Sequence, residues 1–255
     1  MNKTDTSNTG APAFGAPADW PAPASVRSLI TTRRSGASSA PYAGFNLATH
    51  VGDEPAAVAA NRALLALLLP SEPKWLQQVH GTAVADADTC AVETLADAAV
   101  ARQAGSVCVI MTADCLPVLF CDRAGSVVAA AHAGWRGLAA GVLEATLAAM
   151  RVPPDQLMAW LGPAIGPQHF EVGAEVRAAF VDPMPAAATA FAAAAAPGKY
   201  LADLYALARL RLAAAGLSAV YGGGACTYAD VPHYYSYRRD GRTGRMASLI
   251  WLDPA

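Results

Sequence analysis

The sequence predicts a single domain of mixed α/β or α+β class. Three observations favour this class. Strand-like runs alternate with helix-like segments along the chain. Two neighbouring runs are joined by a short turn, which is typical of an antiparallel hairpin. The length of 255 residues suits one large domain with an ample core.

Residues 1–24 differ in composition from the rest of the chain. They are rich in Gly, Ala and Pro, and no basic segment is followed by an apolar one. This composition predicts a disordered tail and argues against a secretory signal. Residues 25–255 are therefore expected to form the single domain.

The composition excludes several classes of protein. Lys and Arg number 18 against 20 Asp and Glu, a formal net charge of −2, which lacks the basic footprint of a nucleic-acid binder. No strongly apolar stretch reaches about 18 residues, so no membrane span is predicted. Five widely spaced cysteines, an odd number, favour free thiols and a cytoplasmic location. Five histidines can supply one metal site but not several.

Turn and cap signals predict the first elements of the domain. A β-rich run predicts a strand within 26–34, which a Ser-Gly pair ends. Asp53 is expected to cap a helix that starts near the following proline and runs to about Leu69. A further strand over 74–79 should stop at His80, which a glycine follows.

Apolar periodicity and turn residues predict the remaining elements. Strands are predicted at 107–111, 116–121, 126–132, 158–161, 219–221, 234–238 and 246–252. Helices are predicted at 138–150, 171–181 and 201–215. The Ala-rich segment 186–196 has no clear period and is consistent with either a helix or a poorly ordered insert.

The predicted hairpin brings two reactive side chains together. A turn over 122–125 places Cys115 directly opposite His132, with Cβ atoms about 4.5–5.5 Å apart. Zinc-bound sulfur and nitrogen lie roughly 2.3 and 2.0 Å from the metal, so such a pair can share one ion. His80, at the end of another strand, is a convenient third ligand. The result is a Cys-His-His site with an open fourth position, the layout of a catalytic zinc.

Two other interpretations of these residues stay open at this point. Cys115 could be a nucleophile with His132 as its base and no metal, because a neighbouring imidazolium increases the thiolate fraction. Alternatively, the residues are a buried thiol and two ordinary histidines. The other four cysteines are expected to be structural, namely Cys90, Cys108, Cys121 and Cys226.

Three short segments resemble the laccase-domain family, whose bacterial members are also described as purine nucleoside phosphorylases and peptidoglycan-editing factors. They are Gln-Gln-Val-His-Gly at 77–81, Thr-Ala-Asp-Cys-Leu-Pro-Val at 112–118 and His-Ala-Gly-Trp-Arg-Gly at 132–137. The resemblance extends from Val26 to Leu252 through segments 46–47, 50–53, 61–62, 161–167, 170–173 and 237–240. One departure is Ser-Gly-Ala-Ser at 35–38, where the family usually has Gly-Gly-Val-Ser.

The resemblance implies an α+β fold, a single domain of mixed β-sheets flanked by helices, similar to the catalytic domain of cytotoxic necrotizing factor toxins. It also implies that His80, Cys115 and His132 bind zinc at the active site. The implied activities are phosphorolysis of adenosine, inosine, guanosine and methylthioadenosine, and deamination of adenosine. The older laccase label implies copper-dependent phenol oxidation, but five histidines cannot supply a multicopper centre. Copper could still enter the one Cys-His-His site.

Substrate-binding candidates are weaker. Arg62 shares the apolar face of its helix, and an inward Arg usually has an anionic partner, so it is the first candidate for phosphate. Arg33 and Arg136 are further phosphate candidates, while Asn46 could bond ribose or base. A basic C-terminal group is formed by Arg238, Arg239, Arg242 and Arg245. A solvated face or intramolecular pairing is the first expectation for it, and phosphate binding is the alternative.

The proton donor is not defined by any motif, since the His-x-Glu and Pro-Cys-x-x-Cys signature of zinc deaminases is absent. Asp114 adjoins Cys115 but should point to the opposite face, and Asp97 is another candidate.

The leading hypothesis is thus a cytoplasmic, zinc-dependent purine nucleoside phosphorylase with adenosine deaminase activity, acting on purine nucleosides and phosphate. The alternatives are a Cys-His hydrolase that edits peptidoglycan precursors, a copper-dependent phenol oxidase and a non-enzymatic metal-binding protein.

Overall fold

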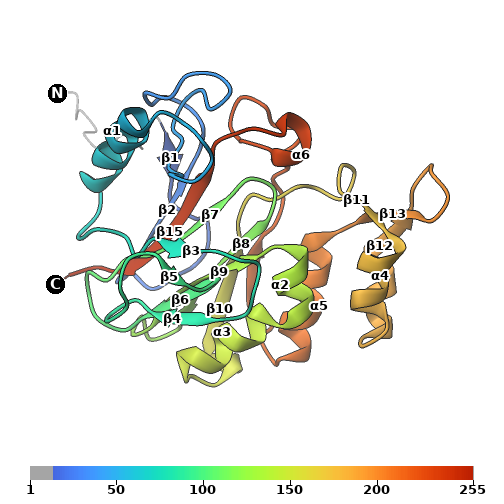
Figure 1. Ribbon diagram of the computed structural model, residues 1–255. Coiled ribbons are helices and arrows are strands. Elements are labelled where there is room, and N and C mark those ends of the chain that lie inside the picture. The colour runs from blue at the N-terminus through green and yellow to red at the C-terminus, as the bar shows by residue number, and fades with distance from the viewer. Residues whose placement is uncertain (1–13, 255) are drawn as a thin grey trace, which may run out of the picture.

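Two β-sheets stacked face to face form the centre of the molecule, and helices cover their outer faces (Figure 1). The computed structural model describes residues 14–254. In spatial order the larger sheet contains β14 (Val220–Gly222), β10 (Leu157–Leu161), β8 (Leu116–Asp122), β9 (Val128–Ala133), β6 (Ala98–Ala101) and β4 (Val84–Asp86). The smaller contains β1 (Gly15–Ala16), β2 (Val26–Thr31), β15 (Met246–Leu252) and β7 (Cys108–Thr112). Parallel and antiparallel pairs occur together in the larger sheet, as predicted.

The central strands are buried on both faces, which explains their continuous apolar character. Alternate residues of β8 divide between two cores. Leu119 packs between the sheets with Ile110 and Ile250. Val118 and Phe120 face the opposite way and pack under the helices. The period of two thus fixes which face of each strand meets which layer.

Helices cover both outer faces of the stacked sheets (Figure 1). On the larger sheet these are α2 (Trp135–Ala140), α3 (Val142–Met150) and α5 (Leu204–Ala214). On the smaller sheet α1 (Pro55–Ala66) packs through Leu65 against Phe45 and Leu47. The flanking helices predicted from the sequence are therefore confirmed.

Shorter elements complete the fold. A small sheet of β11 (Glu171–Gly173), β13 (Lys199–Ala202) and β12 (Phe191–Ala193) packs beside α4 (Ala174–Val181). Two strands, β3 (Leu76–Gln77) and β5 (Thr94–Leu95), pair in parallel. The remaining elements are the 3₁₀ helices η1 (Pro154–Gln156) and η2 (Pro185–Ala190) and the one-turn helix α6 (Tyr237–Asp240).

The predicted hairpin register is wrong by two residues. His132 pairs with Pro117, and Cys115 lies just before β8 begins. The turn contains four residues, 123–126, because the Asp122 carboxylate accepts bonds from the Ser126 amide at 2.7 Å and the Val127 amide at 3.0 Å. A slip of two residues preserves the face of every side chain, so Cys115 still reaches the side on which His132 lies.

Local backbone chemistry explains three further differences. The helix predicted at 138–150 begins at 135 and is interrupted at Gly141, which has a φ of +103°. The strand predicted at 234–238 is wrong, since Ser236 caps α6 by accepting the Arg239 amide at 3.2 Å. Asp53 does not cap α1; Glu54 occupies the cap position, while Asp53 accepts a bond from Asn46.

The lengths of other predicted segments also change. The strand predicted at 74–79 is reduced to β3, and the helices predicted at 171–181 and 201–215 each begin as strands, β11 and β13. The Ala-rich segment 186–196 contains all of η2 except its first residue, followed by β12. Its side chains are too small to mark a buried face, which is why no period is visible in the sequence.

The N-terminal segment differs from the predicted tail where it is described. Gly15 and Ala16 form β1, which pairs antiparallel with β2. Phe14 stacks on Phe45 with ring centroids 4.1 Å apart. These contacts attach residues from 14 onward to the domain, because an edge strand and an aromatic ring each gain a partner there. Residues 1–13 of the predicted tail lie outside the described residues.

The longest helices are short for a bilayer. Within residues 14–254, no helix combines the length and the apolar character that a membrane crossing requires.

Candidate metal centre

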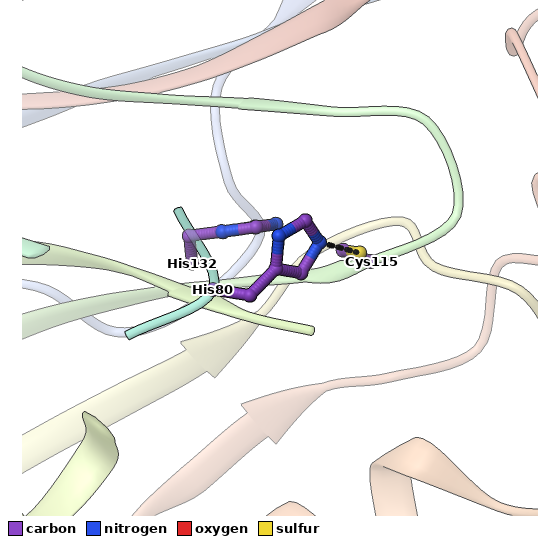
Figure 2. A group of neighbouring side chains, drawn as sticks. All are labelled: His80, Cys115 and His132. Atoms are coloured by element: carbon purple, nitrogen blue, oxygen red, sulfur yellow. Dashed lines mark hydrogen bonds between the residues drawn. The ribbon is translucent and has the colours of Figure 1, made fainter. Parts of the chain in front are cut away.

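His80, Cys115 and His132 converge at the open end of the β8–β9 hairpin (Figure 2). One potential ligand atom from each residue lies within 4.8 Å of the other two. The Cys115 Sγ is 3.7 Å from the His80 Nε2, and the two imidazole rings meet edge to face with centroids 4.7 Å apart. The structure thus brings together the three residues that the sequence predicts as a cluster.

His132 is held by both its backbone and its side chain. Its position in β9 leaves it only 3% exposed, and its amide donates to the Asp97 carbonyl at 2.7 Å. Its Nδ1 lies 2.8 Å from Oδ1 of Asp97, which is fully buried. The carboxylate therefore fixes the ring so that Nε2 is free to face Cys115.

His80 is held by the same carboxylate. It follows β3 in a loop, and its φ of +62° is uncommon for a residue with a side chain. The Asp97 carboxylate accepts hydrogen bonds from the backbone amides of Val79 at 3.1 Å, His80 at 2.8 Å and Gly81 at 2.6 Å. Three bonds to one charged acceptor stabilise this strained turn and aim the imidazole at the cluster.

Cys115 is positioned through its neighbour Asp114, whose φ is +93°. The Asp114 carboxylate is directed to the C-terminal part of the chain. It accepts bonds from the Thr227 hydroxyl at 2.6 Å, the Ser236 hydroxyl at 3.0 Å and the Arg238 amide at 2.7 Å. These three hydrogen bonds anchor the turn that carries the Cys115 thiol. Because the carboxylate is occupied by them, it is unsuited to act as a proton donor.

Gly134, immediately after β9, leaves room for the cluster. A Cβ at this position would lie 2.7 Å from the His80 ring and 3.0 Å from the Cys115 Sγ. Both distances are too short for a side-chain carbon, so any larger residue here would displace a ligand.

The electrostatics of the cluster favour ionisation of the thiol. Burial opposes the thiolate of Cys115, but the positive charge of His132 and hydrogen bonds from His132 and His80 lower its pKa to about 6. Burial also opposes protonation of His132, yet the Cys115 thiolate and the Asp97 carboxylate raise its pKa to about 9. Without a metal, the centre holds a thiolate–imidazolium pair at neutral pH.

The donor set fits a zinc or copper ion. Tetrahedral zinc with ordinary Zn–S and Zn–N bonds places its sulfur and nitrogen ligands about 3.5 Å apart. The Cys115 Sγ and His80 Nε2 are 3.7 Å apart before any metal is added. The carboxylate bonded to the far nitrogen of His132 is the usual outer partner of a metal-binding histidine. The three residues could therefore hold one metal and leave a coordination position open.

A cavity of about 570 Å³ opens onto the cluster. Three aromatic side chains line it, from Trp135, Phe170 and Tyr237. Three guanidinium groups also line it, from Arg136, Arg238 and Arg245. Among the lining residues of the described chain, Asp114 carries the one carboxylate, and it is already hydrogen-bonded. The cavity thus combines flat apolar surfaces with an excess of positive charge.

Of the substrate-binding residues predicted from the sequence, Arg136 lines this cavity. Arg62 is half-buried, but its guanidinium lies 3.9 Å above the Trp75 ring and donates to the Leu47 carbonyl. Asn46 is fully buried, and its side-chain amide forms hydrogen bonds with neighbouring backbone groups. Arg33 stacks on Tyr235. The last three side chains are outside the cavity lining.

Two arginines of the basic C-terminal group line the cavity, Arg238 and Arg245, although the sequence favours a solvated face or intramolecular pairing for them over phosphate binding. Arg239 bonds backbone carbonyls, which is intramolecular pairing, and Arg242 is exposed beside Tyr42. The segment 237–240 resembles the family, which is the signal that could have pointed to Arg238.

His50 also lines the cavity and was given no role from the sequence. Its pKa is lowered by burial and by the positive charges of Arg245 and Arg62. At neutral pH it is therefore an uncharged imidazole beside a guanidinium.

A family model described as multi-copper polyphenol oxidoreductase laccase matches residues 27–253. A Pseudomonas aeruginosa protein named as a purine nucleoside phosphorylase is 58% identical over 234 residues, covering 92% of this chain and 96% of the relative. The Escherichia coli purine nucleoside phosphorylase YfiH is 53% identical over 237 residues, covering 91% and 96%.

Solved structures show the same fold. A Neisseria meningitidis protein superimposes with a TM-score of 0.91 at 56% identity, covering 94% of this chain and all of that one. YlmD from Geobacillus stearothermophilus gives a TM-score of 0.82 at 30% identity, with coverages of 96% and 95%.

Zinc binding to the cluster should weaken as the pH falls, because the metal must displace protons from its ligands. Between about pH 9 and pH 6, His132 carries a proton to displace, whereas the Cys115 thiolate carries none. The zinc affinity should fall about tenfold per pH unit in this window and more steeply below it. Competition with a chelator whose own pKa values are known measures the zinc affinity at each pH. An affinity that is constant between pH 8 and pH 7 would contradict this assignment.

The substitution Asp97→Asn should lower zinc affinity by about 10–100-fold, because His132 loses the charged partner that fixes its ring. Asp155→Asn is the control, since that side chain is exposed and remote from the cluster. Zinc titration measures the affinity, and thermal unfolding of the metal-free variants identifies any loss of fold. A folded Asp97→Asn protein that binds zinc normally would refute the positioning role.

Proposed function

The chain belongs to the multi-copper polyphenol oxidoreductase laccase family, and from this premise we propose that it is a zinc-dependent purine nucleoside phosphorylase. The substrates we propose are adenosine, inosine, guanosine and methylthioadenosine, with phosphate as the second reactant. One observation carries the proposal. A Cys-His-His cluster lies at a cavity whose aromatic and guanidinium side chains suit a purine and a phosphate.

The aromatic side chains suit the base. Trp135, Phe170 and Tyr237 offer flat surfaces on which a purine ring can stack. Phe170 is itself held near the guanidinium of Arg238, 5.4 Å from the ring centroid. The cavity volume of about 570 Å³ lies within the range usual for small-molecule sites.

The guanidinium groups suit the phosphate. Phosphorolysis joins a phosphate oxygen to C1′ of the ribose while the bond from C1′ to the purine nitrogen breaks. The Arg136 side chain is exposed and makes no hydrogen bond to residues 14–254, so its donors are available for an anion. Arg238 and Arg245 each bond backbone carbonyls with one guanidinium nitrogen and retain other donors. We propose that these three groups hold the phosphate against the ribose.

The cluster supports the chemistry beside the substrate. A zinc ion held by His80, Cys115 and His132 would supply Lewis acidity at this end of the cavity. Asp97 keeps both histidines in place, and its own pKa remains low because the bonds from His132 and the loop amides outweigh its burial. The same centre could promote deamination of adenosine, in which water adds at C6 and ammonia leaves. We include this activity in the proposal.

A second candidate is a Cys-His hydrolase that edits peptidoglycan precursors. The observation that favours it is the chain of Cys115, His132 and Asp97, which has the order nucleophile, base and orienting carboxylate. Copper-dependent phenol oxidation is a third candidate, because copper binds such nitrogen and sulfur ligands well. The described residues contain one such cluster, whereas a multicopper enzyme needs several.

We propose that the protein acts in the cytoplasm. All five cysteines are free thiols, as expected in a reducing compartment.

Zinc-loaded protein incubated with inosine should release hypoxanthine and ribose 1-phosphate only when phosphate is present, and adenosine should release ammonia. Cys115→Ala should abolish both reactions together with zinc binding. Chromatography and metal analysis measure these outcomes. Untouched nucleosides, with loss of an amino acid from a muropeptide precursor, would favour the hydrolase instead. Oxidation of phenols by the copper-loaded form alone would favour the oxidase.

Arg136→Met should raise the KM for phosphate by about tenfold or more and change the KM for the nucleoside little, because one charge-assisted contact to the anion is lost. Arg242→Met is the matched control, since Arg242 is also exposed but lies outside the cavity lining. Initial rates at varied phosphate measure the difference. The assignment fails if both variants behave alike.

A further inference from the structure

A second cysteine–histidine pair lies apart from the metal centre. The Cys226 Sγ is 3.5 Å from the His169 Nδ1. Cys226 follows β14, while His169 precedes β11, so the fold joins two distant segments of the chain. Neither residue lines the cavity that opens onto the cluster. The function proposed above therefore leaves this pair without a role.

Both members of the pair are held in place. The Gly166 amide donates to the Cys226 Sγ at 3.2 Å, and the His169 amide donates to the Gly166 carbonyl at 3.0 Å. The His169 ring stacks on Tyr228 with centroids 4.5 Å apart and planes 22° apart. The thiol thus has a fixed amide donor on one side and an oriented imidazole on the other.

The other cysteines show what is distinctive about Cys226. Cys108 and Cys121 are buried in the core between the sheets, and burial raises the pKa of both thiols. Cys90 is partly exposed, as Cys226 is, but in the described part of the chain it has no imidazole partner. Cys115 belongs to the metal centre. Cys226 is therefore the accessible thiol outside that centre that has a base within reach.

The surroundings favour one kind of chemistry. Acyl transfer needs donors that stabilise an oxyanion, but the Gly166 amide at this pair already donates to the sulfur. A thiolate and a proton acceptor are sufficient for thiol–disulfide exchange, which needs no oxyanion site. The pair meets this requirement.

We propose that Cys226 is a modification site, a nucleophilic thiol that exchanges with low-molecular-weight disulfides, and that His169 is its base. His169 accepts the thiol proton at Nδ1, and the Cys226 sulfur attacks one sulfur of the disulfide. A new sulfur–sulfur bond forms as the original one breaks, and the released thiolate takes a proton. Cys226 is oxidised to a mixed disulfide, and half of the small disulfide is reduced to a thiol.

The test uses the full-length, zinc-loaded protein and glutathione disulfide as the probe. Peptide mapping by mass spectrometry follows the rate at which each cysteine gains a glutathione. Cys226 should react about tenfold or more faster than Cys90, which provides an internal standard of similar exposure. Equal rates at Cys226 and Cys90 would overturn the proposal, and this comparison requires no variant.

A variant tests the role of His169. His169→Phe keeps an aromatic ring to stack on Tyr228 but removes the base. The rate at Cys226 should fall about tenfold toward that of Cys90, while the rate at Cys90 stays the same. An unchanged rate at Cys226 would refute the role of His169. Cys226→Ser should remove the fast site from the peptide map; a fast site that persists would place the reaction at another cysteine.

Discussion

The metal centre depends on the hydrogen bonds that the Asp97 carboxylate accepts. This one buried group accepts hydrogen bonds from three backbone amides of the loop around His80 and from the ring nitrogen of His132. A carboxylate with this many donors stays ionised despite burial, and its charge in turn favours the protonated imidazole. The ionised thiol of Cys115 follows from that imidazolium. Geometry and charge in the cluster therefore have one common origin, a fully buried side chain that does not line the cavity.

A second carboxylate, Asp114, couples the cluster to the wall of the cavity. Its three bonds tie the turn before Cys115 to Thr227, Ser236 and the Arg238 amide. These bonds hold the C-terminal segment beside the cluster and bring Arg238 to the cavity, which Arg245 also lines. The two carboxylates divide the work. Asp97 positions the two histidines of the cluster, and Asp114 positions Cys115 and the Arg238 backbone at the cavity wall.

The amino-acid sequence predicts the fold class and the three clustered residues, because apolar periodicity and short motifs are local signals. The hairpin register was wrong because a four-residue turn closed by the Asp122 carboxylate differs little in sequence from a shorter one. Arg62 does face inward, but the sequence does not reveal that its neighbour is Trp75 rather than a ligand. Arg245 reaches the cavity through contacts between segments about 200 residues apart, such as the hydrogen bond that its backbone amide donates to the Asn46 side chain. Contacts of this kind leave no local pattern in the sequence.

The arrangement of His80 distinguishes between the two uses of the cluster. A cysteine nucleophile with His132 as base and Asp97 as orienting group is complete without His80. Yet the chain holds His80 at a positive φ, stabilises that turn with three bonds to Asp97, and has a glycine at 134 where any Cβ would strike the ring. Strain of this kind, of the order of 1–3 kcal/mol, persists where the surrounding structure enforces it. A third ligand explains the constraint, because three converging donors are what a catalytic metal requires. The geometry therefore favours metal binding over simple thiol nucleophilicity.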